Sequence, residues 1–145
     1  MVDVEFKEKS SALIEKHHQN CLFRGLLKDG GDLSFSFDKR GELSGRFFCH
    51  ERFQGYDDRV HGGVIAAIID ESMVHCLMGH GAVGVTTDLR IKYRQPVYIG
   101  KHAEFFTRIT DSFLDNTLYH LSTDVYQGGK KVITAKSKFY TGFKE

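Results

Sequence analysis

The segment His61-Gly62-Gly63 precedes a long apolar stretch and has the residue types of a site that polarises a carbonyl group. The stretch predicts a helix from about Gly63 to Met78, so the segment lies where backbone N–H groups lack a partner within the helix. Glycine lets a ligand approach the backbone, and the positive end of the helix dipole stabilises a carbonyl oxygen that becomes anionic. Attack on an ester or a thioester requires this chemistry. The alternative is that the two glycines only allow a tight turn into the helix, which is the better interpretation of so short a motif taken alone.

Asp70 follows two helical turns later, after an otherwise apolar stretch. Residues three and four apart share a helix face, which places Asp70 beside Gly63, Ala66 and Ala67. These small neighbours leave room for a substrate or for another backbone. A partly desolvated carboxylate there suits a general base. For Asp70 alone a structural hydrogen-bonding role is equally plausible, but together with the upstream His-Gly-Gly we interpret it as catalytic.

The charge balance, the cysteines and the absence of certain motifs exclude several classes of protein. The chain has 145 residues, with 20 basic and 19 acidic side chains, which argues against a global electrostatic design for nucleic acid or an anionic membrane. Cys21, Cys49 and Cys76 show no zinc spacing, so we expect reduced thiols and no metal site. No phosphate-binding or dinucleotide motif is present in the sequence, so we expect no cofactor. No signal peptide is recognisable, so we expect a cytoplasmic location.

The remaining pattern predicts one α+β domain over residues 1–145. Its parts are an N-terminal helix within residues 1–20, a central helix within 61–79 and the main strands within 83–143. A hairpin is expected before the central helix, with strands at 33–37 and 43–49, and then a loop over 51–59. Four strands are expected after it, at 85–93, 103–109, 118–126 and 132–143. Short turns join these strands, so successive strands are expected to pair antiparallel.

Three stretches of the sequence together resemble a known family. The run HGGVIAAIIDESM at residues 61–73, preceded by QGY at 54–56 and followed by VTTDLRIKYRQPV at 85–97, resembles the hot-dog thioesterase superfamily. The most similar branch contains the phenylacetate-pathway and hydroxybenzoyl-CoA-type enzymes, and the resemblance covers about residues 18–143. It implies a curved antiparallel sheet of five to six strands wrapped around one long central helix. It also implies a homodimer, or a dimer of dimers, with sites between subunits.

The resemblance implies hydrolysis of a small aryl- or short- to medium-chain acyl-CoA to a free acid and CoA, with coenzyme A as part of the substrate. Gly62 would polarise the thioester carbonyl through its N–H group, and Gly63 would contact the substrate. Asp70 of the other subunit would activate water or attack directly, and His61 would orient the carbonyl region. Thr86 would help to position the water, although an ordinary strand threonine is an equal alternative.

Three basic side chains, Arg90, Lys92 and Arg94, alternate with the apolar residues of their predicted strand. They are candidates for binding the CoA phosphates, although a solvated outer face is the stronger interpretation of each one singly. Glu71 is expected to pair with His75 or with a strand lysine.

One position departs from the family pattern. Gly55 stands near where related enzymes carry an amide side chain. Two alternatives therefore stay open, a non-catalytic acyl-CoA-binding or regulatory protein and, less favoured, a dehydratase or hydratase.

Overall fold

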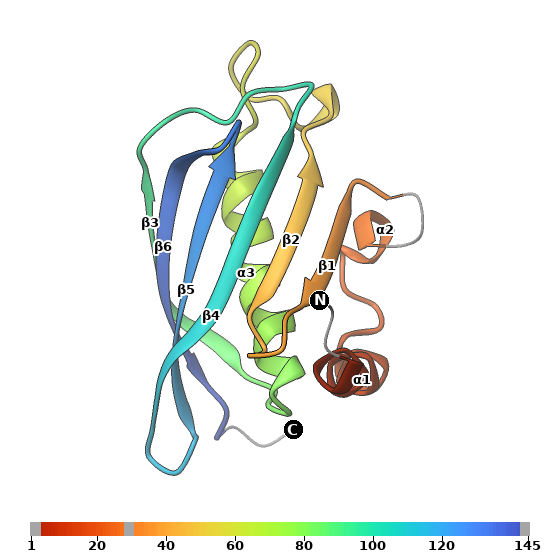
Figure 1. Ribbon diagram of the computed structural model, residues 1–145, viewed down its shortest axis with the longest axis vertical. Coiled ribbons are helices and arrows are strands. Elements are labelled where there is room, and N and C mark those ends of the chain that lie inside the picture. The colour runs from red at the N-terminus through yellow and green to blue at the C-terminus, as the bar shows by residue number, and fades with distance from the viewer. Residues whose placement is uncertain (1–3, 28–30, 143–145) are drawn as a thin grey trace.

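A curved antiparallel sheet wraps around a long helix in the computed structural model, which describes residues 4–27 and 31–142 (Figure 1). Within these residues the elements in chain order are α1 Val4–Leu13, a π-helical turn Ile14–His18, α2 Arg24–Leu27, β1 Leu33–Phe37, β2 Leu43–Phe48, a 3₁₀ turn Glu51–Phe53, α3 Gly62–Gly79, β3 Val85–Tyr93, β4 His102–Phe113, β5 Leu118–Gln127 and β6 Lys130–Tyr140. The predicted α+β class and the hot-dog architecture are confirmed. The predicted strand end at residue 143 lies outside the described residues.

The strand order corrects one expectation from the sequence. In the described chain the six strands are ordered β1-β2-β4-β5-β6-β3, and every neighbouring pair is antiparallel. The expected pairing of β3 with the next strand, β4, is therefore wrong, because β3 pairs with β6 at the sheet edge. The segment 94–101 makes this possible: eight extended residues reach about 26 Å, whereas three strand spacings need about 14 Å.

The concave side of the sheet buries α3, as the apolar sequence of this helix predicts. Ile65, Ile68 and Met73 have at most 1% of their surface exposed, and the sheet covers them with fully buried Phe47 and Phe105. By length and composition alone α3 would also suit a membrane span, but 61% of it is buried inside the fold. Its apolar surface is therefore explained by the core.

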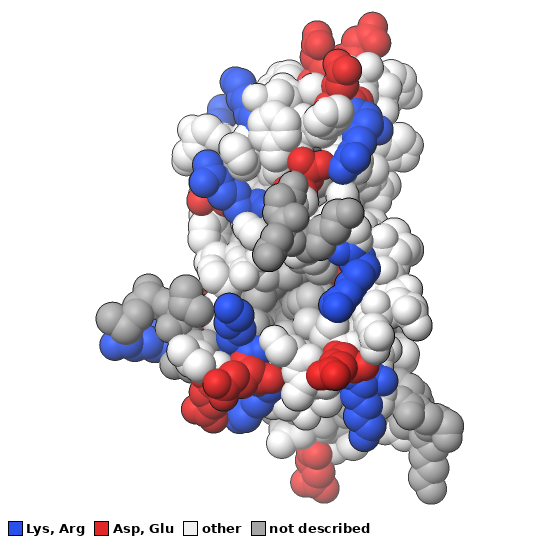
Figure 2. Space-filling view, turned by 90° about the vertical axis from the view of Figure 1, so that its right-hand side faces the viewer, with Lys and Arg blue, Asp and Glu red and all other residues white. Residues whose placement is uncertain are grey.

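Helix α1 packs against the C-terminal end of α3 and against the hairpin of β1 and β2. Phe6 of α1 stacks on Phe37 with ring centroids 6.1 Å apart and lies 4.8 Å from the ring of His80. The face of the molecule that carries α1 and α2 mixes basic and acidic side chains (Figure 2). This mixture agrees with the near balance of charge in the sequence.

Helix α3 begins with a histidine cap. His61 has extended backbone angles (φ −57°, ψ 130°), and its Nδ1 atom accepts a hydrogen bond of 2.9 Å from the Gly63 N–H. The His61 N–H in turn donates to the Phe53 carbonyl at 2.8 Å. The segment before it, predicted as a plain loop, contains the 3₁₀ turn and a bridge between Gln54 and Val60. These contacts fix the direction in which α3 starts.

We predict that the cap contributes to stability independently of any chemistry. His61→Ala removes the acceptor of the Gly63 N–H and should lower the free energy of unfolding by about 1 kcal/mol. His61→Asn restores a good capping residue and should recover most of this loss. Urea unfolding followed by circular dichroism measures both. Equal stability of the alanine variant and the wild type would contradict the capping role.

Candidate active site

A β-bulge in β3 decides which threonine faces the helix. Thr86 pairs with Phe139 and Asp88 pairs with Lys138, so Thr87 is an extra residue in the strand. Strict alternation along the strand predicted at 85–93 would place Thr87 on the face of Leu89, and the bulge prevents this. The bulge shifts the register, and Thr86 faces α3 instead.

The bulge brings Thr86 to Asp70. The Thr86 hydroxyl donates to Asp70 Oδ1 at 2.5 Å, at a half-buried position between α3 and β3. This bond joins two of the residues predicted to be catalytic. The second carboxylate oxygen of Asp70 has no hydrogen-bond donor among the described residues, so it remains available to a water molecule.

The start of α3 borders a cavity of about 860 Å³. Its walls come from the segment before the helix, the first helical turn and the segment after β3, and they include His61, Gly62, Gly63, Tyr93 and Val97. The Gly62 carbonyl accepts a hydrogen bond of 2.7 Å from the Tyr93 hydroxyl, and partial burial raises the pKa of Tyr93. The Gly62 N–H has no acceptor in the described part of the chain, which leaves it free for a substrate oxygen.

Gly62 and Asp70 do not meet within one chain. They are eight residues apart on the same helix, which corresponds to about 12 Å along its axis. A thioester carbonyl that accepts a hydrogen bond from Gly62 therefore lies too far from Asp70 of the same chain for attack. Asp70 also does not line the cavity at the helix start.

The structure gives a reason for glycine at position 55. A Cβ atom there would lie 3.1 Å from the Cα of His61, tighter than nine in ten ordinary Cβ contacts. The amide of the preceding residue is already used, because Gln54 Oε1 accepts a hydrogen bond of 3.1 Å from the Asp58 N–H. An amide side chain at position 55 would therefore require the backbone of the capping histidine to shift by a few tenths of an ångström.

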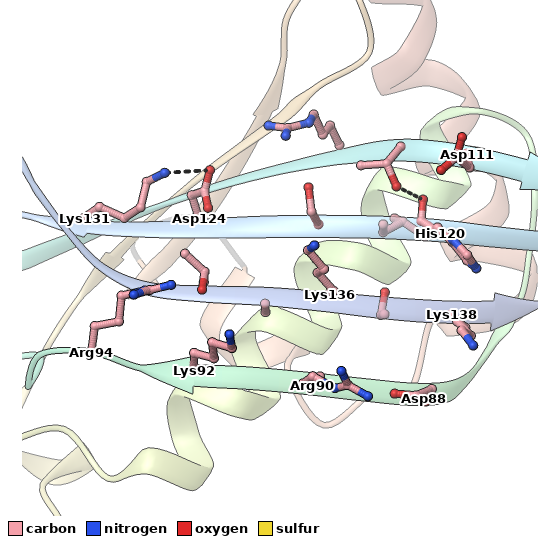
Figure 3. Close-up of a pocket in the computed structure, with 17 residues that line it drawn as sticks. Asp88, Arg90, Lys92, Arg94, Asp111, His120, Asp124, Lys131, Lys136 and Lys138 are labelled. Atoms are coloured by element: carbon pink, nitrogen blue, oxygen red, sulfur yellow. Dashed lines mark hydrogen bonds and ion pairs between the residues drawn. The ribbon is translucent and has the colours of Figure 1, made fainter.

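The basic stripe lies on the other face of the sheet. Figure 3 shows Arg90 and Lys92 of β3 beside Lys136 and Lys138 of β6, with α3 behind the strands. These side chains line a shallow hollow that does not include Asp70 or Gly62. Arg94 differs, because it borders both this hollow and the cavity at the helix start.

Glu71, next to Asp70, points into the protein and is only 3% exposed. His75 Nε2 lies 3.3 Å from Glu71 Oε1, which confirms the predicted pairing, but the strand lysine predicted as the other option does not appear among its contacts in the described residues. Its shorter contacts are with His18 and Cys21. Desolvation by burial opposes ionisation of Glu71, yet His75, Cys21 and His18 outweigh it and lower the pKa to about 2.

Sequence reasoning missed Tyr93 as a site residue. The sequence places Tyr93 only at the end of the strand predicted at 85–93, and in the structure its hydroxyl reaches Gly62 of α3. Its contact with the first helical turn depends on how β3 crosses the helix, which no local pattern reveals. The N-terminal contacts of Glu71 were missed for the same reason, since His18 is 53 residues away in the sequence.

Comparison with known proteins finds a matching family and a related sequence. The model of the thioesterase superfamily matches residues 58–113. A mitochondrial protein of Candida albicans is 30% identical over 95 residues, which are 59% of this chain and 41% of that protein. The chain thus spans less than half the length of this relative.

Several solved structures resemble the whole fold. Thioesterase superfamily member 2 of zebra fish has a TM-score of 0.77 at 17% identity, over 97% of this chain and 100% of that one. The PaaI protein from the phenylacetic acid degradation operon of E. coli has a TM-score of 0.79 at 14% identity, over 97% and 96%. A hypothetical thioesterase protein of Streptococcus pneumoniae, solved with coenzyme A, has a TM-score of 0.70 at 16% identity, over 78% and 90%.

At these identities the structural likeness is one of fold, and the family model adds the match over the start of α3, β3 and β4. The resemblance predicted from the sequence is confirmed: the chain has the hot-dog fold of the thioesterase superfamily, and residues 58–113 match that superfamily.

Proposed function

We propose that this protein hydrolyses a small aryl- or short- to medium-chain acyl-CoA thioester to a free acid and CoA. The observation that carries the proposal is the hydrogen bond from Thr86 to Asp70, which holds a half-buried carboxylate in one orientation beside an exposed sheet edge. The superfamily match supports thioester chemistry in general. The choice of a small aryl or a short- to medium-chain acyl group is proposed here together with the reaction.

The reaction needs a base and a site for the developing oxyanion. Asp70 takes a proton from water, the water oxygen bonds to the thioester carbon, and the Gly62 N–H stabilises the carbonyl oxygen. The C–S bond then breaks, and CoA leaves as a thiol after protonation. Direct attack by Asp70 followed by hydrolysis of the anhydride uses the same two groups.

Two copies of the chain would bring these groups together. Strand β3 is at the sheet edge, and its end residues Val85 and Tyr93 are 46% and 51% exposed. An open edge strand of this length favours pairing with another strand. An antiparallel, two-fold pairing centred on Leu89 sets Val85 of one copy opposite the partner's Tyr93. Because Tyr93 contacts Gly62 and Thr86 contacts Asp70, this pairing moves the partner's Gly62 towards Asp70.

Structures of the Streptococcus pneumoniae protein support this assignment. Two of them replace an aspartate and a threonine by alanine, at positions sixteen apart, and another contains coenzyme A. Asp70 and Thr86 are also sixteen apart. The same spacing in the same fold favours Asp70 and Thr86 as the residues to test.

The first test measures release of free thiol from a panel of aryl- and acyl-CoAs. Asp70→Asn should lower kcat/KM by roughly 10²- to 10⁴-fold, the range expected when a general base is lost. Thr86→Val should lower it by about tenfold, because the carboxylate loses the hydrogen bond that orients it. Thr87→Val is the matched control on the adjacent, exposed bulge residue and should stay within about twofold of the wild type.

Full activity of Asp70→Asn would refute the mechanism. Tight binding of every acyl-CoA without turnover by the wild type would refute hydrolysis and favour a binding protein of the same fold.

A second test concerns the CoA phosphates. We expect Arg94, at the rim of the cavity, to bind a phosphate, so Arg94→Gln should raise KM for acyl-CoA about tenfold. The same variant should leave KM unchanged for an acyl-pantetheine, which lacks the nucleotide. Arg90→Gln, on the outer face of β3 and away from the cavity, is the matched control. An equal rise in KM for both substrates would contradict a phosphate contact at Arg94.

A further inference from the structure

We propose that His18, Cys21 and Glu71 bind a zinc ion that ties the N-terminal segment to helix α3, with His75 as the nearest fourth donor. These residues lie apart from the proposed catalytic groups, since the buried Glu71 side chain leaves α3 in a direction about 100° around the helix axis from Asp70. The pairs are spaced as His-x-x-Cys before the sheet and Glu-x-x-x-His on the helix. No metal site was expected from the sequence, because the cysteines and histidines were judged to show no zinc spacing. The two halves of the cluster are about fifty residues apart in the chain.

The distances suit a metal. His18 Nε2 lies 2.7 Å from Glu71 Oε1, Cys21 Sγ lies 3.0 Å from Glu71 Oε2, and the ligand atoms of the three residues all lie within 4.8 Å of one another. A tetrahedral zinc ion with bonds of about 2.0–2.3 Å keeps its ligand atoms roughly 3.3–3.8 Å apart. Small movements therefore convert the hydrogen-bonded cluster into a coordination shell.

A buried nitrogen next to the cluster makes no hydrogen bond with any described residue. His75 is 6% exposed, and its Nε2 atom makes no hydrogen bond in the described part of the chain. That atom is aimed at the cluster, 3.3 Å from Glu71 Oε1. A buried polar atom without a hydrogen bond is uncommon in a folded protein, and the charge contact with Glu71 does not supply one. A zinc ion beside the Glu71 carboxylate would give His75 Nε2 a coordination bond instead.

The donor types select the metal. Imidazole nitrogen, thiolate sulfur and carboxylate oxygen together suit zinc, whereas calcium and magnesium prefer shells of oxygen. Binding releases the Cys21 thiol proton to solvent. The thiolate of Cys21 and the carboxylate of Glu71 then balance the two positive charges of the ion, so the site is neutral. Neutrality lowers the electrostatic cost of placing a divalent ion in a largely buried position.

The location suggests a structural role and an access route. A hollow lined by residues 15–21 reaches His18 and Cys21 from solvent, so a metal ion can reach them. Cys21 lies between the π-helical turn and α2, while Glu71 and His75 belong to the buried helix. The ion would therefore fasten a peripheral segment to the core. No ligand in the set comes from the cavity at the start of α3.

The test is zinc binding by the full chain after removal of metal with a chelator. We expect one zinc ion per chain, a rise in Tm on addition of zinc, and, with cobalt(II) as a probe, an absorption band from a thiolate bond. Cys21→Ser and His18→Gln should each weaken zinc binding by more than about 100-fold, because loss of a residue that only supports a ligand already costs roughly 10–100-fold. Both positions are only half-buried, so these variants should fold.

His17→Gln, one residue from His18, is the control and should bind zinc like the wild type. Far-UV circular dichroism confirms that each variant is folded. The proposal is overturned if the metal-free wild type takes up no zinc at micromolar concentration. It is also overturned if folded Cys21→Ser and His18→Gln bind zinc as tightly as the wild type, because the ion would then lie elsewhere.

Discussion

Helix α3 holds Gly62 and Asp70 about 12 Å apart, and this fixed separation is the constraint on which the rest of the account depends. The helix is buried along most of its length by the curved sheet, so it cannot bend or slide to shorten the distance. A group that stabilises an oxyanion and a base that attacks the same carbonyl must lie within a few ångströms of each other. One chain carries both proposed groups, but it cannot present them to the same thioester.

Strand β3 offers a way around this constraint. It crosses α3 so that Tyr93 touches the first helical turn and Thr86 touches Asp70, and it does so at the open edge of the sheet. Antiparallel pairing of two such edges exchanges the ends of β3 between copies. The bulge at Thr87 belongs to the same arrangement, because without it Thr86 would face the outer surface with Arg90 and Lys92. Strand β3 thus forms the edge of the sheet and also carries Thr86, which positions the proposed base.

Much of this fold was predictable from local patterns. The strands 33–37 and 85–93 agree with β1 and β3 to the residue, and the helix expected within 61–79 is α3, because alternation and an apolar run are properties of neighbouring residues. The pairing of β3 with β6 was not predictable, since it depends on the reach of the segment 94–101. Gly55 shows the same limit for the site: its lack of a side chain is explained by the His61 backbone, which only the folded chain brings close.

The most direct test of the shared site is complementation between two inactive variants. Asp70→Asn removes the base, and Gly62→Pro removes only the N–H, because proline suits the first helical position, and the extended backbone of His61 is compatible with a following proline. Each variant alone should be inactive. After subunits are exchanged in an equal mixture, half of the dimers should contain both variants, and one site in each should be intact. The account predicts recovery of about one quarter of wild-type kcat; a mixture that stays inactive despite confirmed subunit exchange would contradict it.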